Sequence, residues 1–264
     1  MIVLFVLKLP KHVPSSAQAR KQALMSEKET IYWLECVDST QLELKRKLQE
    51  NPDMAHLSAV VADSQDNGRG RGVSKWHDVK GNSVLLSVLI RWPEPVQESF
   101  DVNRWVCCRL SLALPSKVEF KWPNDMMVGN RKLGGMLIEN HWGSQGIKSS
   151  ILGLGINVRA SSEDIDRSIA IEALGVKGSV RQWTEEILAV LHPTATEFSD
   201  IPNLRKRYEQ LLWGRSIWKN YSADGGPFEA QVAHVQPSGL LTLKLRNGDL
   251  VDYDIDQVRW MNPY

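Results

Sequence analysis

The segment with the clearest chemical potential is a run of alternating glycine and arginine. Residues 68–72 read GRGRG, and a lysine and a tryptophan follow at Lys75 and Trp76. Glycines allow backbone N–H groups to crowd around an anion, and arginines bind carboxylates or phosphates through paired hydrogen bonds. The spacing matches neither a P-loop nor a dinucleotide-binding fingerprint. We therefore expect an anion-binding loop of another type, with a solvated basic loop as the alternative.

Three further segments combine polar groups with the ends of strands. Residues 121–125 read KWPND, a lysine before a rigid corner that can present an amide and a carboxylate to a cleft. Residues 131–139 read RKLGGMLIE, an apolar strand with two glycines where another group can approach the backbone closely. Residues 153–158 read GLGINV, an apolar strand with one amide. Each segment alone is also compatible with an ordinary turn or core strand, so only their combination is informative.

The hydrophobic pattern predicts the elements that must position these groups. A cap at residues 38–40 starts a helix that runs to about residue 50, and a long polar loop covers residues 64–82. Further helices are predicted at 98–114, 161–174, 179–191 and 201–213. Strands are predicted at 31–37, 58–62, 83–92, 118–122, 133–139 and 149–158, and turns at 129–130 and 142–143.

From residue 214 the pattern changes to short alternating strands. They are predicted at 216–221, 228–235, 240–245, 251–253 and 258–260, with turns at 224–226, 237–239 and 247–248. Asn-Gly between two alternating strands is a strong hairpin signal, and five short strands in about 50 residues indicate a small barrel. We therefore divide the chain near Trp213 into a lead-in at 1–30, a core at 31–213 and a barrel at 214–264.

Composition narrows the class of protein. The chain has 264 residues, of which 42% are hydrophobic and 24% charged, which is typical of a globular protein. Its net charge of +1 argues against a protein that holds DNA by bulk charge. Three cysteines without metal-ligand spacing argue against a structural metal and favour a reducing compartment. The apolar run at residues 2–7 is too short for a membrane span or a signal segment, so we expect a cytoplasmic protein.

Taken together, the four segments, in this order and spacing, resemble the biotin–protein ligases (biotin–[biotin carboxylase] ligases) over about residues 31–264. The resemblance implies an α+β fold: a mixed β-sheet catalytic core with flanking helices, like that of class II aminoacyl-tRNA synthetases and biotin–lipoate ligases, plus a small C-terminal SH3-like β-barrel. It also implies the short class of this family, because some 30 residues before the core are too few for a DNA-binding winged helix.

The family reaction that the resemblance implies has two steps. Biotin and ATP, with Mg²⁺, form biotinyl-5′-AMP and pyrophosphate, and a lysine of a biotin carboxyl carrier protein, an acetyl-CoA carboxylase subunit, then displaces AMP. The expected partners are this carrier and the two small molecules, without DNA or membrane, and a homodimer is one assembly open to such a protein. Fixed cations are the main requirement, because charge develops on an already anionic phosphate.

The resemblance also implies roles for individual residues. Ser39, Thr40, Gln41 and Gln65 match positions that bind the biotin rings, although Gln41 stands where Asn is more usual. Arg69, Gly70 and Arg71 match loop contacts to the biotin carboxylate and the activated phosphate. Lys132 matches the lysine between these two groups, with Gly135 beside it. Gly68, Trp76, Asn124 and Asn157 match nucleotide positions. Asp125 is the candidate general base for the acceptor amine, or else a residue that orients Lys132. Ser74 stands where many members have Arg, and Lys75 is a candidate to supply that charge.

Other interpretations remain open at this stage. A lipoate–protein ligase shares the implied fold and chemistry but is expected to have a different glycine-rich loop. A carrier-binding module without activity is disfavoured by Lys132 and the two loop arginines, and a DNA-binding repressor by the near-zero charge. Cys107 and Cys108 are expected in the core, and the basic run at 205–207 on a solvated helix face.

Overall fold

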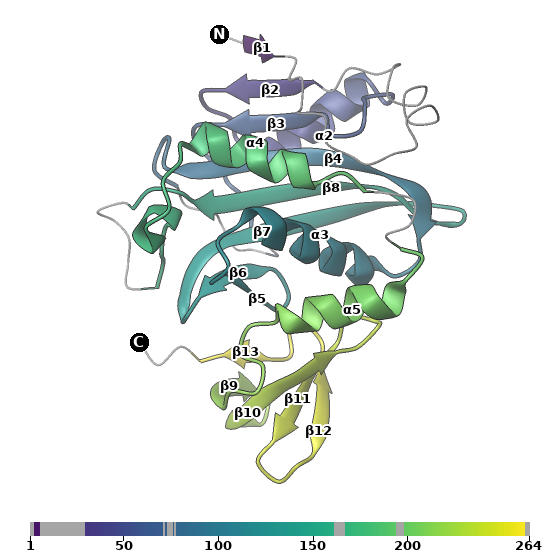
Figure 1. Cartoon of the computed structure of the whole chain (residues 1–264). Helices are drawn as coiled ribbons and strands as arrows, with labels where there is room; N and C mark the ends of the chain where they lie inside the picture. The colour runs from purple at the N-terminus through teal and green to yellow at the C-terminus, as the bar shows by residue number, and fades with distance from the viewer. Residues whose placement is uncertain are drawn as a thin grey trace, which may run out of the picture.

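The computed structural model describes residues 3–5, 30–70, 72, 76, 78–160, 167–193 and 198–261. Its centre is an eight-stranded mixed sheet in the order β1-β2-β3-β4-β8-β7-β6-β5 (Figure 1). Only β2 and β3 are parallel among the described pairs, and the other neighbours are antiparallel. The strands are β1 Val3–Phe5, β2 Ile31–Leu34, β3 Ala59–Ala62, β4 Ser83–Val96, β5 Glu119–Lys121, β6 Asp125–Val128, β7 Arg131–Gly143 and β8 Gly146–Asn157.

Helices cover both faces of this sheet because its central strands are apolar on both sides. On β4, Leu86 and Val88 belong to the large apolar cluster that α3, α4 and α5 complete, whereas Leu89 packs in a second cluster with Leu44 of α2. Helix α2 therefore covers one face, and the other three helices cover the opposite one (Figure 1). The helices are α2 Thr40–Glu50, α3 Ser99–Ala113, α4 Val180–Val190 and α5 Ile201–Gln210, with a short 3₁₀ turn η1 at Ile171–Leu174.

A second, five-stranded antiparallel sheet follows α5, in the order β12-β11-β10-β9-β13. In Figure 1 it lies beside the β5 end of the large sheet. Its inward residues, such as Tyr221 and Leu243, join the same apolar cluster as α3 and α5. The strands are β9 Lys219–Ala223, β10 Gly226–Val235, β11 Leu241–Leu245, β12 Leu250–Tyr253 and β13 Arg259–Trp260.

The strands and helices agree well with the sequence predictions, with four differences. The prediction of a turn at 142–143 is wrong: these residues end β7, and the turn follows at 144–145. The helix predicted at 161–174 is reduced, in its described part, to η1. Strand β6 was not predicted, because its four residues begin at the last residue of KWPND and end just before the next turn, which leaves too short a pattern to indicate a strand. In the lead-in, residues 3–5 form β1 and pair with β2.

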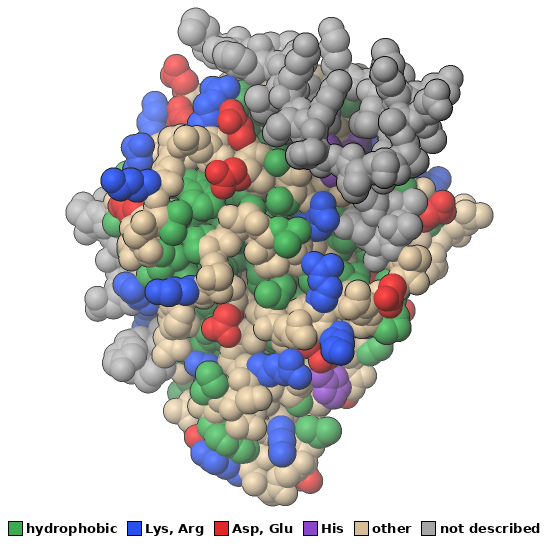
Figure 2. All heavy atoms as spheres, viewed as in Figure 1, with side chains coloured by type: hydrophobic (Ala, Val, Ile, Leu, Met, Phe, Trp, Pro, Cys, Tyr) green, Lys and Arg blue, Asp and Glu red, His purple; other side chains and the backbone are tan. Residues whose placement is uncertain are grey.

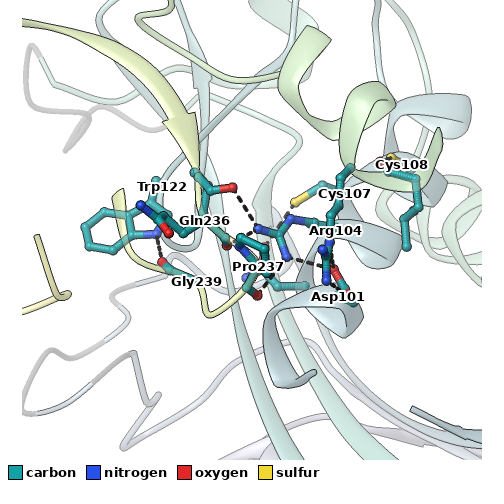
Figure 3. Close-up of polar contacts among 12 residues, drawn as sticks. Asp101, Arg104, Cys107, Cys108, Trp122, Gln236, Pro237 and Gly239 are labelled. Atoms are coloured by element: carbon teal, nitrogen blue, oxygen red, sulfur yellow. Dashed lines mark hydrogen bonds and ion pairs between the residues drawn. The ribbon is translucent and has the colours of Figure 1, made fainter. Parts of the chain in front are cut away.

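A buried cation joins the core to the C-terminal sheet. The Arg104 side chain on α3 is fully buried, and its guanidinium donates to the backbone carbonyls of Val235, Gln236 and Pro237 (Figure 3). It also donates to Asp101 Oδ1 at 2.7 Å. A buried guanidinium needs such a full set of acceptors, because an unpaired one is costly. The turn after β10 is thereby tied to α3.

Two contacts reinforce this junction. The Asp101 carboxylate also accepts from Arg205 of α5, with Nη2 at 2.8 Å from Oδ2, so Arg205 is not the solvated residue that the sequence predicted. The indole N–H of Trp122, within KWPND, donates to the Gly239 carbonyl at 2.8 Å (Figure 3). Cys107 and Cys108 lie buried in α3, as predicted.

We predict that Arg104→Met lowers the free energy of unfolding by about 3 kcal/mol, because it leaves buried carbonyl groups without a donor. Urea denaturation of the purified chain measures this. Arg46→Met is the matched control, since Arg46 forms an exposed ion pair with Asp38 and its loss should leave the midpoint nearly unchanged. Equal midpoints for the two variants would contradict the structural role of Arg104.

Candidate active site

A cavity of about 560 Å³ lies on the α2 face of the large sheet, a volume typical of small-molecule sites. Ser87 on β4 lines it and points away from Leu86 and Val88, which face the α3 side. The cavity brings together most of the residues that the sequence predicted for the site. These are Ser39, Thr40, Gln41, Gln65, Arg69, Gly70, Trp76, Asn124, Asp125, Lys132 and Gly135.

One part of the wall is a row of uncharged polar side chains at the start of α2. The side-chain amide oxygen of Gln65, Oε1, accepts from the Thr40 N–H at 2.8 Å and from the Thr40 hydroxyl at 3.1 Å. The same hydroxyl lies 2.9 Å from Ser87 Oγ, and Ser87 donates to Gln41 Oε1 at 3.0 Å. Thr40, Gln41 and Ser87 are buried, so these bonds hold the side chains in one arrangement.

A second part of the wall is a carboxylate between two lysines. Asp125 Oδ1 lies 2.6 Å from Lys132 Nζ, and Oδ2 lies 3.1 Å from Lys121 Nζ. Strand pairing accounts for the first lysine, because Asp125 on β6 lies directly opposite Lys121 on β5. Lys132 comes from β7, which pairs with the other edge of β6. The backbone of Lys132 is held in turn by the 167–169 segment, with Lys132 N–H donating to the Arg167 carbonyl at 2.8 Å.

The charges around Asp125 decide what it can do. Burial raises the pKa of its carboxyl, but Lys132 and Lys121 outweigh burial and bring the pKa below the ordinary 3.8. A carboxylate whose pKa is lowered in this way is a weaker proton acceptor at neutral pH than an ordinary one. The geometry therefore favours the role in which Asp125 orients Lys132 over that of a general base.

Trp76 covers the cavity from the loop side. Its indole lies against the backbone of Gly155, where a Cβ would come within 2.6 Å of the ring, so a side chain at this position would displace the indole. Lys132 Nζ lies 6.0 Å from the centre of the same ring. Gly155 pairs with Gly135 across β8 and β7, which brings the indole, the lysine and the glycine pair to one place.

Three predicted residues are not among those that line the cavity. The Asn157 amide donates to the Ile169 carbonyl at 3.3 Å and accepts from Ser83 at 3.4 Å, so it holds a neighbouring segment. The Gly68 carbonyl accepts from the Trp76 N–H at 2.9 Å and so joins the two ends of the loop. Arg71 lies outside the described residues, as do Ser74 and Lys75.

The cavity also contains residues that sequence analysis did not assign to the site. Lys121, Gly153 and Gly155 belong to the motifs, so their positions carried a local signal. Ile255, Asp256 and Arg259 come from the C-terminal part of the chain, where no motif marks them. The complete unassigned set is Gly72, Ser87, Lys121, Met136, Leu137, Gly153, Leu154, Gly155, Ile255, Asp256 and Arg259.

The charge of the lining suits an anionic ligand. The basic lining residues are Arg69, Lys121, Lys132 and Arg259, and the acidic ones are Asp125 and Asp256. This local excess contrasts with the exterior seen in Figure 2, where basic and acidic side chains lie among one another. Within the described residues, no group of three or more His, Cys, Asp or Glu could hold a metal ion. None of the helices described here has the length and apolarity that a bilayer crossing requires.

Comparison with known proteins agrees with this geometry. Residues 33–157 match the profile of the Biotin/lipoate A/B protein ligase family. The resemblance predicted from the four motifs is therefore confirmed over residues 33–157.

Individual relatives extend the match beyond that segment. The chain is 23% identical over 245 residues to the Bifunctional ligase/repressor BirA of Bacillus spizizenii. The aligned region covers 86% of this chain and 73% of that protein. It is 28% identical over 133 residues to the Biotin--[acetyl-CoA-carboxylase] ligase of Paracoccus denitrificans, which covers 48% and 53%. The Biotin protein ligase from Aquifex aeolicus in complex with biotin and ATP has the same fold, with a TM-score of 0.65, 22% identity and coverage of 88% and 98%. The predicted α+β fold is confirmed.

We predict that Asp125→Asn destabilises the chain at neutral pH by about 1–3 kcal/mol, because two lysines lose their shared charged partner. The folded-state pKa of Asp125 is below the ordinary 3.8, so its contribution is present above that pH and disappears as the pH falls through the lowered pKa. Urea titrations of both chains between neutral pH and pH values below 3.8 test this. A difference between them that stays constant over that range would contradict the ion pairs.

Proposed function

We propose that this chain is an ATP-dependent biotin–protein ligase of the biotin–[acetyl-CoA-carboxylase] ligase type. It activates biotin as biotinyl-5′-AMP and transfers the biotinyl group to a lysine of a biotin carboxyl carrier protein. The observation that carries the proposal is the single cavity that unites the uncharged polar row at Thr40 with the cations at Lys132. The ligand complexes of the related ligases support the same pair of substrates.

The arrangement suits a molecule with a polar ring system at one end and a carboxylate at the other. Gly153, beside Gln41, and Gly155, beside Trp76, are two residues apart on β8 and so lie about 7 Å apart on the same face. A ligand whose ring lies near Gln41 can therefore bring a carboxylate toward Lys132 and Arg69. Binding energy at the ring then positions the carboxylate for attack on the α-phosphate.

In the first step, biotin carboxylate attacks the α-phosphate of ATP, and pyrophosphate leaves. Negative charge develops between two groups that already repel each other, so preorganised cations lower the barrier most. Lys132 is the main candidate, because Asp125 fixes its ammonium on the cavity wall. Mg²⁺ enters as part of the nucleotide co-substrate, since this ion binds mainly through phosphate oxygens and water.

In the second step, the amine of the carrier lysine attacks the mixed anhydride, and AMP leaves. Arg71 and Arg69 are assigned to the loop that retains the adenylate, and Trp76 to its cover, on the strength of the family resemblance. Excluding water matters here because the anhydride hydrolyses. We place the protein in the cytoplasm, where its carrier and ATP are available, and the division at residues 31–213 and 214–264 into catalytic core and SH3-like barrel belongs to the same proposal.

The purified chain should label a biotin carboxyl carrier domain with biotin in the presence of ATP and Mg²⁺. Mass spectrometry of the carrier and measurement of released pyrophosphate detect the product. The carrier with its acceptor lysine replaced by arginine is the control. Labelling without ATP would contradict the proposal, and labelling with lipoate but not biotin would assign the chain to the lipoate ligases instead.

Lys132→Ala should slow pyrophosphate release about 10²- to 10³-fold, because it removes a fixed charge at the developing phosphate charge. Biotin-dependent exchange of labelled pyrophosphate into ATP measures this step alone. Arg131→Ala is the matched control, since Arg131 is the adjacent exposed cation on β7 and does not line the cavity. Near-parental exchange in Lys132→Ala would show that another cation supports adenylation.

A further inference from the structure

The row of polar side chains at Thr40 continues behind the cavity to a buried amide and a carboxylate. The Gln41 amide lies across three neighbouring strands, with contacts to Ser87 on β4, Ile151 on β8 and Glu139 on β7. Gly153 makes room for it, because a Cβ there would lie 2.6 Å from Gln41 Oε1. Glu139 itself is not among the lining residues.

The partners of Gln41 determine which way its amide points. Gln41 Nε2 lies 2.9 Å from Glu139 Oε2 and 3.3 Å from the Ile151 carbonyl oxygen. A carboxylate and a carbonyl can only accept, so the NH₂ group must face them and Oε1 must face Ser87. Burial raises the pKa of Glu139, but hydrogen bonds from Lys45 and Gln41 outweigh it and hold the pKa below the ordinary 4.5, so the carboxyl is ionised.

With the amide in this orientation, the hydroxyl groups of Ser87 and Thr40 must each donate their proton to a neighbouring protein atom. Gln41 Oε1 can only accept, so Ser87 must donate its single proton to it over 3.0 Å. The Thr40 hydroxyl must then donate its own proton to Ser87 Oγ at 2.9 Å, because two oxygens at that distance without a shared proton would repel each other. Gln65 Oε1, at 3.1 Å, lies on the same inner side, so both protons point into the protein. The hydroxyl oxygens of Thr40 and Ser87, two residues that line the cavity, therefore offer it lone pairs.

We propose that Glu139 is a positioning residue that sets the direction of the hydrogen-bond chain Glu139–Gln41–Ser87–Thr40, and that this direction makes the cavity select a ring with an N–H donor. The inference rests on the proposed function and deepens it. A cyclic urea carries N–H donors, whereas the dithiolane ring of lipoate carries none. A ring oxygen in place of the N–H would face hydroxyl lone pairs and be rejected.

The test is calorimetric titration with biotin and with its two cyclic carbamate analogues, in which one or the other ureido N–H is replaced by oxygen. The parent should bind biotin about 10- to 100-fold more tightly than the analogue that lacks the N–H at Thr40. Glu139→Ala should lose most of this preference, because Gln41 and Ser87 can then reorient. In turnover it should raise the KM for biotin and leave kcat near the parental value.

Lys45→Met is the matched control. It removes the 2.7 Å ion pair between Lys45 and Glu139 but leaves the bond from Gln41 to Glu139, so the preference for biotin should persist. If Glu139→Ala instead weakens the binding of biotin and of both analogues by the same factor, Glu139 has only a structural role and the inference is wrong.

A readout without ligand separates this inference from the proposed function. The side-chain amide protons of Gln41, assigned by NMR with Gln41→Leu, should exchange slowly with solvent in the parent and in Lys45→Met, and quickly in Glu139→Ala. Unchanged exchange in Glu139→Ala would overturn the hydrogen-bond chain. A parent that binds no biotin but shows the expected amide exchange would overturn the proposed function and retain the chain of hydrogen bonds.

Discussion

Asp125 is the group on which the charge arrangement of the cavity depends. Lys132 and Lys121 both lie within 3.1 Å of its carboxylate, and without it two ammonium groups would repel each other on one wall. The carboxylate stays ionised despite its burial because both lysines contact it. One acid on β6 thus allows the flanking strands β5 and β7 to present Lys121 and Lys132 to a ligand in a defined geometry, instead of as a mobile positive patch. The cost is that Asp125 itself becomes a poor base.

Glycines on the sheet surface are the second requirement. The Gln41 amide lies over Gly153, and the Trp76 indole lies over Gly155. Gly134 meets the Gly155 carbonyl, where a Cβ would be 2.5 Å away. Side chains at Gly153 and Gly155 would fill the space that the Gln41 amide and the Trp76 indole occupy, and a side chain at Gly134 would collide with the backbone of β8. The same face of β8 thereby serves both the ring-binding and the charge-binding parts of the cavity, which is why a single ligand can span them.

The C-terminal sheet belongs to the site as well as to the fold. Arg104 and Trp122 bind the turn between β10 and β11, and Trp122 lies in the KWPND motif next to Asn124 and Asp125. The segment between β12 and β13 contributes Asp256, and β13 contributes Arg259, to the cavity lining. A displaced C-terminal sheet would therefore change both the motif and the charges near it. The buried guanidinium of Arg104 makes such a displacement costly, because it leaves a buried cation and carbonyl groups unpaired.

The sequence by itself determined the elements and much of the site. Periodicity located the central strands and four of the helices, because local residue types carry local structure. The resemblance of the four motifs to a known family, and not the pattern itself, predicted that Lys132, Asp125 and the loop residues share one site. Periodicity did not reveal strand β6 or the turn at 144–145, because short strands and the turns between long strands contain too few residues to show a pattern. Only the tertiary structure showed that Arg259 and Asp256 reach the cavity, that Arg205 pairs with Asp101, and that Gln41 of α2 donates to Glu139 of β7. Those contacts join residues 98 to more than 100 positions apart, and such pairings depend on packing and strand order, which no local pattern encodes.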